Sequence, residues 1–216
     1  MEKKCFVFDL DGTLLDTLDT INYYLSKTLT SNGYRAVTRD ECRSFVGDGS
    51  RILLTRALKS QGEESAEVAE RLCREYVAAY NKDPFFLTKP YPGVCEMLSE
   101  LRSRGIRLAI LSNKPHSSVI LIVEKIFGDT FDIVEGASDG KPLKPSPECL
   151  YRIANELSVE PSECVFVGDS GVDMQTGKSA GAYSVGVLWG YRPESELSRM
   201  GADMLINDAL VLTQIK

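Results

Sequence analysis

The chain has 216 residues, of which 43% are hydrophobic and 26% are charged. These proportions are typical of a folded globular protein, and the length allows one core domain with a smaller insert. The formal net charge of −6 argues against nonspecific nucleic-acid binding, which requires a basic surface.

The six cysteines are scattered along the chain without a CxxC pair, which argues against a zinc or redox motif and favours a reducing compartment. The apolar run near the N-terminus is too short for a signal peptide. No segment approaches the roughly 18 consecutive apolar residues that would span a bilayer. The sequence therefore predicts a cytoplasmic protein that does not interact with membranes, and it gives no indication of the oligomeric state.

The first predicted element is a buried strand over residues 5–8, which is followed directly by Asp9-Leu10-Asp11-Gly12-Thr13. Because side chains alternate along an extended chain, Asp9 and Asp11 leave it on the same side. Two neighbouring carboxylates repel each other and resist burial, so such a pair usually persists because a cation or a reaction uses it. Gly12 allows a sharp turn or a close approach of the backbone to a ligand.

Residues 16–82 contain no convincing strand, and their apolar side chains recur at helical spacing instead. Thr38 and Glu41 form a plausible capping box. This pattern predicts a four-helix insert directly after the acidic loop, with residues 83–93 as the return linker. Such an insert would lie above the carboxyl ends of the strands as a lid. The apolar positions in question are Leu18, Ile21, Leu25, Leu29, Ile52, Leu53, Ala57, Val68, Leu72 and Val77.

The remainder of the chain alternates between helical and extended segments. The pattern predicts an α/β fold whose core is a doubly wound, Rossmann-like parallel sheet made of residues 1–15 and 83–216, with residues 16–82 as the helical cap. The helices are expected at 93–104, 115–127, 147–157 and 171–180, and the strands at 106–111, 131–134, 164–167, 183–188 and 202–206.

Polar groups follow two of these strands at the edge where parallel strands of an open sheet bind ligands. Ser112 and Asn113 stand between a strand and a helix, where a hydroxyl and an amide can bind an anion or simply cap the helix. Lys144 precedes another helix, where it can pair with a phosphate or the acids, although a solvated loop lysine is the common alternative. Asp169 ends the strand at 164–167, and one helical turn would carry Asp173 back towards it.

These residues are expected to converge on one site. Asp9, Asp11, Asp169 and Asp173 offer only oxygen ligands, which suit Mg²⁺. Ser112 and Lys144 would supply hydrogen-bond donors to a phosphate held by the same ion.

The order of these motifs resembles the haloacid dehalogenase-like hydrolase superfamily: DxDGT, then Ser-Asn-Lys-Pro, then Lys-Pro-x-Pro, then GDxxxD. The helical insert after the first motif is similar to the small cap of the phosphoglycolate phosphatase-like members. The segments 45–49 (FVGDG), 91–94 (YPGV) and 186–191 (GVLWGY) resemble the same subgroup.

The resemblance implies a reaction and a role for each residue. Asp9 would be the nucleophile that forms an aspartyl-phosphate, and Asp11 the acid and then the base. Asp9, the backbone carbonyl of Asp11, and Asp169 would hold Mg²⁺, with Asp173 assisting. Ser112, Asn113 and Lys144 would bind the phosphoryl group. The implied substrate is a small phosphorylated metabolite, with 2-phosphoglycolate as the leading candidate.

Other functions remain open at this point. Dehalogenases and phosphonate hydrolases of the superfamily lack a carboxylate at the position of Asp11, so its presence favours phosphate esters. A sugar phosphomutase similar to β-phosphoglucomutase, or a pyrophosphatase, would use the same residues. A phospho-accepting signalling receiver is a remote alternative, because a receiver is a single domain of about 120 residues without the helical insert.

Several other residues admit two interpretations. Arg51 either reaches the substrate from the cap or is a solvated helix residue. His116 is expected at the surface or near the site without a catalytic role. Trp189 and Tyr191 are expected to pack the loop after a late strand.

Overall fold

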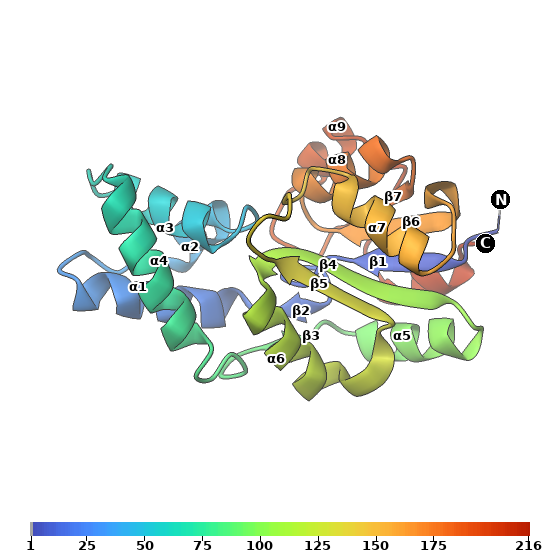
Figure 1. Ribbon diagram of the computed structural model, residues 1–216, viewed down its shortest axis with the longest axis horizontal. Helices are drawn as coiled ribbons and strands as arrows, with labels where there is room; N and C mark the ends of the chain where they lie inside the picture. The colour runs from blue at the N-terminus through green and yellow to red at the C-terminus, as the bar shows by residue number, and fades with distance from the viewer. Residues whose placement is uncertain (1) are drawn as a thin grey trace.

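The structure is a computed structural model that describes residues 2–216. Its main sheet has six parallel strands: β1 (Cys5–Phe8), β4 (Arg107–Pro115), β5 (Ile133–Ala137), β6 (Cys164–Gly168), β7 (Tyr183–Val187) and β8 (Met204–Ile206). Their order in space is β5-β4-β1-β6-β7-β8, and Figure 1 labels the first five of these strands. The predicted doubly wound α/β core is confirmed.

Helices cover both faces of the sheet, and the side chains of β1 show why. Phe6 and Phe8 belong to one hydrophobic cluster, whereas Cys5 and Val7 belong to the other. This alternation buries both faces of the strand, as expected for a parallel sheet. The covering helices are α5 (Val94–Ser103), α6 (His116–Phe127), α7 (Glu148–Glu156), α8 (Gly171–Ala180) and α9 (Glu194–Arg199).

Some predicted boundaries differ from the structure. Strand β4 continues to Pro115, four residues beyond its predicted end, and β8 begins at Met204 rather than at residue 202. The short helix α9 and a final 3₁₀ helix, η3 (Ala209–Gln214), were not expected from the sequence. Two further 3₁₀ turns, η1 (Gly128–Thr130) and η2 (Pro161–Glu163), precede β5 and β6.

The insert consists of four helices, as predicted: α1 (Leu18–Ser31), α2 (Arg39–Phe45), α3 (Ser50–Lys59) and α4 (Ala66–Tyr80). In Figure 1 they form a separate body at one end of the core. The capping box of α2 is present, because Glu41 N donates to Thr38 Oγ1 (3.2 Å) and Thr38 N donates to Glu41 Oε2 (2.8 Å). We call these four helices the cap.

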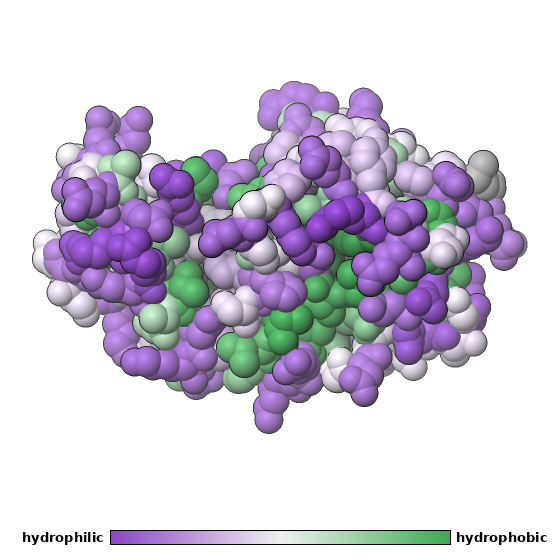
Figure 2. Space-filling view, in the orientation of Figure 1, coloured by the Kyte–Doolittle hydropathy of each residue, from purple (hydrophilic) through white to green (hydrophobic). Residues whose placement is uncertain are grey.

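The cap has its own apolar interior. Leu25, Leu54 and Leu72 come from three different helices and are fully buried. Ile52 lies outside this interior and is 38% exposed, because Leu53, Leu54, Ala57 and Leu58 define the inner face of α3. Figure 2 shows the outer side of the cap as mostly hydrophilic. No helix within residues 2–216 is both long enough and apolar enough to cross a membrane.

A two-stranded antiparallel ribbon joins the start and the end of the insertion. Strand β2 (Leu15–Asp16) pairs with β3 (Lys89–Pro90), with Asp16 opposite Lys89. Strands of two residues are too short to produce a periodic pattern, so the sequence did not indicate this ribbon. It lies at the neck between the core and the cap, close to the predicted boundaries at residues 15/16 and 82/83, which stay a prediction.

Candidate active site

Three neighbouring strands bring the predicted acidic and polar residues to one edge of the sheet. Strand β1 lies between β4 and β6, with Phe8 paired to Ile110 on one side and to Val167 on the other. Asp9 and Asp169 therefore follow adjacent strand ends. The topology thus assembles residues that are 160 positions apart in the chain.

Three carboxylates form a compact buried cluster at this edge. One oxygen from each of Asp9, Asp169 and Asp173 lies within 4.8 Å of the others. Asp173 reaches the cluster from the first turn of α8, where the backbone N–H and the hydroxyl of Ser170 donate to its Oδ2 (3.0 and 2.6 Å). The expected return of Asp173 towards Asp169 is thus present in the structure.

Two glycines make room for this cluster. A Cβ atom at Gly12, whose φ is +83°, would lie 2.4 Å from Asp169 Oδ2, and a Cβ at Gly190 would lie 2.2 Å from the Cβ of Asp169. Side chains at these positions would displace the carboxylate, so the backbone must approach it closely here. Tyr191 N, next to Gly190, donates to Asp169 Oδ2 (2.7 Å).

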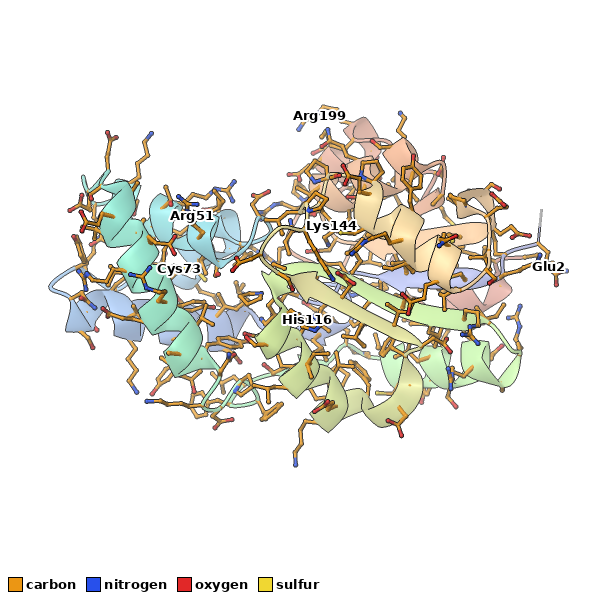
Figure 3. All side chains as sticks on the ribbon, in the orientation of Figure 1. Glu2, Arg51, Cys73, His116, Lys144 and Arg199 are labelled. Carbon is orange, nitrogen blue, oxygen red and sulfur yellow. The ribbon has the colours of Figure 1, made fainter. Side chains whose placement is uncertain are left out.

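Lys144 is the cation at the centre of the cluster. Its Nζ lies 2.9 Å from Asp9 Oδ1 and 2.6 Å from Asp173 Oδ1, and its side chain is 1% exposed. Burial alone would lower the pKa of Lys144, but the two carboxylates raise it above its ordinary value. Lys144 is therefore a permanent positive charge beside Asp9. Figure 3 shows Lys144 at the edge of the core.

The cluster still has more negative than positive charge, because three carboxylates share one ammonium group. Burial raises the pKa of Asp9 to about 6, with Lys144 opposing the rise, and burial together with Asp173 raises the pKa of Asp169 well above its ordinary value. Within residues 2–216, Asp9 Oδ1 has no hydrogen bond of good geometry, although it lies close enough to Lys144 for an ion pair. A divalent cation would satisfy these oxygens, so the residues fit a metal site.

The raised pKa of Asp9 predicts how stability depends on pH without metal. In the folded protein Asp9 stays protonated up to about pH 6, whereas in the unfolded chain it loses its proton near pH 4. Asp9 therefore makes the folded state less stable as the pH rises from about 4 to about 6. Asp9→Asn should therefore raise the free energy of unfolding by about 3 kcal/mol at pH 7.5 and by roughly half of that at pH 5. Urea unfolding in EDTA measures both values, and a variant less stable than the wild type at pH 7.5 would contradict the charge balance.

Asp11 lies beside this cluster and is bound by two residues that sequence analysis did not identify. Lys114 Nζ donates to both carboxylate oxygens of Asp11 (3.0 Å each), and Thr17 Oγ1 donates to Oδ1 (2.7 Å). Tyr191 donates or accepts a hydrogen bond with the same Thr17 hydroxyl (3.1 Å). The expected contribution of the Asp11 backbone carbonyl to a metal site stays a prediction.

The other predicted phosphate-binding residues lie beside Lys144. Ser112 is buried within β4 and lines the cavity, and its Oγ accepts a hydrogen bond from Lys114 N (3.3 Å). The side chain of Asn113 binds the backbone of Lys144 and of the cap: its Oδ1 accepts from Lys144 N (2.9 Å), and its Nδ2 donates to Lys144 O (3.1 Å) and Gly47 O (3.3 Å). Asn113 therefore positions Lys144 and contacts the cap. Its expected contact with a phosphoryl group stays a prediction.

A cavity opens above these residues, between the core and the cap. The cap contributes mainly apolar side chains to its wall, namely Ile21, Val46, Leu53, Tyr76 and Tyr80. Arg51 is not part of this wall: its Nε lies 3.5 Å from Glu70, and both side chains are largely exposed. Figure 3 shows Arg51 on the cap. The structure thus supports the solvated interpretation of Arg51.

The remaining aromatic and histidine side chains stabilise loops around the site. His116 Nδ1 accepts a hydrogen bond from Gly136 N (3.2 Å), and Trp189 Nε1 donates to Thr13 O (3.0 Å). Tyr191 lines the cavity and binds Thr17, so it contributes to the wall as well as to loop packing.

Comparisons with known proteins agree with this site. A family model of haloacid dehalogenase-like hydrolases matches residues 6–187. The phosphoglycolate phosphatase of Aquifex aeolicus is 35% identical over 194 residues, which are 87% of this chain and 86% of the relative. The phosphoglycolate phosphatase of Psychrobacter arcticus is 31% identical over 215 residues, which are 96% of this chain and 93% of the relative. The crystal structure of a predicted phosphoglycolate phosphatase from Haemophilus somnus matches with a TM-score of 0.91 and 25% identity, over 99% and 98% of the two chains.

The chain therefore belongs to the haloacid dehalogenase-like hydrolases. Within that family it is a phosphatase similar to phosphoglycolate phosphatases.

Proposed function

We propose that this protein is a Mg²⁺-dependent phosphatase that hydrolyses a small phosphorylated hydroxy acid of the phosphoglycolate type through an aspartyl-phosphate on Asp9. The observation that carries the proposal is the position of Asp9: it is the member of the three-carboxylate cluster that faces both Lys144 and the cavity. A phosphoryl group in this cavity would meet a carboxylate nucleophile and a buried cation together.

Asp9, Asp169, Asp173 and the backbone carbonyl of Asp11 are the groups that would hold Mg²⁺. A bound divalent ion neutralises the negative charge of the phosphoryl group and of the carboxylates. Carboxylate oxygens without histidine or cysteine are the donor set that Mg²⁺ prefers.

In the first step, an oxygen of Asp9 attacks phosphorus, the new O–P bond forms, and the bond to the leaving alkoxide breaks. Lys144 stabilises the charge on the phosphoryl oxygens, and Ser112 donates a hydrogen bond from within β4. Asp11 gives its proton to the leaving alkoxide. Because an ammonium group has only donors, Asp11 must release Lys114 from one of its oxygens to carry that proton.

In the second step, water attacks the phosphorus of the aspartyl-phosphate. Asp11 takes a proton from this water, the bond between phosphorus and the Asp9 oxygen breaks, and inorganic phosphate leaves with Asp11 protonated again. The cap would limit the access of bulk water during the first step.

Phosphate release tests the proposal directly. With Mg²⁺, we expect fast release from 2-phosphoglycolate and slower release from sugar phosphates, nucleotides and pyrophosphate, with Asp9→Asn as the blank. Release of phosphate mainly from pyrophosphate would favour a pyrophosphatase. If no phosphate is released and a sugar 1-phosphate is converted into its 6-phosphate isomer, the protein is a phosphomutase.

A further inference from the structure

The cavity is lined by one cation that does not contact the phosphoryl group in the proposed reaction. Among the cavity-lining residues within 2–216, Lys114 and Arg192 carry the positive charges. Arg192 is bound to the cap, because its Nη1 donates to Arg43 O (2.6 Å) and its Nη2 to Val46 O (2.5 Å). Lys144 lies deeper, between two carboxylates of the cluster. Lys114 is therefore the cation available to a group in the cavity.

Asp11 does not bind all three N–H groups of the Lys114 ammonium. Two of its three N–H groups are accounted for by the two oxygens of Asp11, both 3.0 Å away. The side chain is 6% exposed, so bulk water does not readily satisfy the third. Its Nζ lies 4.3 Å from the centre of the Tyr80 ring, at the end of cap helix α4. The third N–H thus faces Tyr80 at the boundary between core and cap.

Tyr80 adds a hydroxyl group in the same place. Its side chain is 1% exposed, and within residues 2–216 its buried hydroxyl has no hydrogen-bond partner of good geometry. A buried hydroxyl without a partner is unfavourable unless a ligand supplies one. Tyr80 and Lys114 both line the cavity, so one acceptor group could bind both donors.

The positions of Lys114 and Tyr80 relative to Asp9 and Asp11 indicate which part of the substrate carries the acceptor group. Lys144 contacts Asp9, which attacks phosphorus, whereas Lys114 contacts Asp11, which protonates the leaving oxygen. A group bound to Lys114 therefore belongs to the leaving alcohol. Once Asp11 has released Lys114 from one oxygen, the path from the leaving oxygen through the two carboxylate oxygens of Asp11 to Nζ spans at most about 8 Å. The anionic group must therefore lie within a few carbons of the phosphorylated oxygen.

We propose that Lys114 and Tyr80 form the subsite for a carboxylate on the leaving group, and that Lys114 is the residue that selects phosphorylated short-chain hydroxy acids over phosphate esters of uncharged alcohols. This inference rests on the proposed phosphatase function and identifies its specificity determinant. The apolar side chains around the pair, Leu53 and Tyr76 among them, leave the carboxylate few other partners and disfavour larger hydrated leaving groups.

Binding of two phosphonates that cannot be hydrolysed tests the proposal without turnover. In 3-phosphonopropionate a methylene replaces the bridging oxygen of 2-phosphoglycolate, and in propylphosphonate a methyl group also replaces the carboxylate. Calorimetric titration of the Mg²⁺-loaded protein should show that the wild type binds the first at least tenfold more tightly than the second. Equal affinities for the two probes, or no binding of either, would overturn the proposal.

The matched variants are Lys114→Met, Lys114→Arg, Tyr80→Phe and, as a surface control, Lys141→Met, whose Nζ pairs with Glu135 away from the cavity. Lys114→Met should reduce the affinity ratio to less than threefold, Tyr80→Phe should reduce it partly, and Lys114→Arg and the control should retain most of it. If Lys114→Met keeps the ratio, or lowers the affinity for both probes equally, Lys114 is not the specificity determinant.

Turnover separates failure of this inference from failure of the proposed function. A wild type that hydrolyses ethyl phosphate as fast as 2-phosphoglycolate would be a phosphatase without the carboxylate subsite. A wild type that binds the phosphonates with the expected ratio but releases no phosphate from any ester would keep the subsite and refute the phosphatase mechanism.

Discussion

Asp9→Asn should lower kcat by at least about 10⁴-fold while the protein remains folded. An amide oxygen does not form a stable bond to phosphorus, so the covalent route through Asp9 is lost, and removal of a nucleophile generally costs losses of this order. Since the same substitution removes a buried charge from a crowded cluster, the variant should be at least as stable as the wild type without metal. Steady-state phosphate release and thermal unfolding measure the two effects.

Asp139→Asn is the matched control for this loss, because it removes an exposed carboxylate outside the cavity lining. It should retain wild-type turnover. Activity of Asp9→Asn above a few per cent of the wild type, with the same substrate preference, would exclude Asp9 as the nucleophile.

Removal of the metal is the second change with a large expected effect. Excess EDTA should stop turnover, and added Mg²⁺ should restore it, because the carboxylate cluster has too little positive charge to receive an anionic substrate. Asp169→Asn should lower activity at limiting Mg²⁺ by at least about 100-fold, the upper range for residues that support a metal site. Titration of activity against free Mg²⁺ measures both.

Two outcomes of these measurements would contradict the proposed metal site or its ligands. Undiminished turnover in excess EDTA would contradict the metal site. An Asp169→Asn variant with the same half-saturating Mg²⁺ concentration as the wild type would remove Asp169 from the proposed ligand set.

The sequence predicted the strand-end residues of the site because topology alone brings them together. Once the chain is recognised as a parallel sheet, the residues that follow adjacent strands must meet at one edge, and Asp9 and Asp169 do so. The helical period also predicted the return of Asp173. These inferences need only the order of elements and the side-chain direction, which local patterns contain.

The residues that sequence analysis missed depend on contacts between distant segments. Lys114 is part of the recognised Ser-Asn-Lys-Pro motif, but its ion pair with Asp11 spans 103 positions and its contact with Tyr80 crosses from core to cap. The predicted end of β4 at residue 111 also placed Lys114 in a turn, whereas the strand continues to Pro115. No local signal in the sequence distinguishes this lysine from a loop lysine.

Arg51 illustrates the opposite case, in which a local pattern suggested a contact that the structure does not make. Its position at the start of a cap helix after two glycines was compatible with substrate contact. In the structure its neighbours Ser50 and Leu53 line the cavity, and one residue corresponds to about 100° of helix rotation. Arg51 therefore lies on a different side of α3, where it pairs with Glu70.

The central claim of this account is that Asp9 carries the phosphoryl group during turnover. Acid quenching during the first turnover with 2-phosphoglycolate and Mg²⁺, followed by peptide mass spectrometry, tests it most directly. We predict a transient mass increase of one phosphoryl group on the peptide that contains Asp9, which is absent from Asp9→Asn. Phosphate release from the wild type at full rate, with every peptide unmodified throughout the first turnover, would contradict the covalent mechanism.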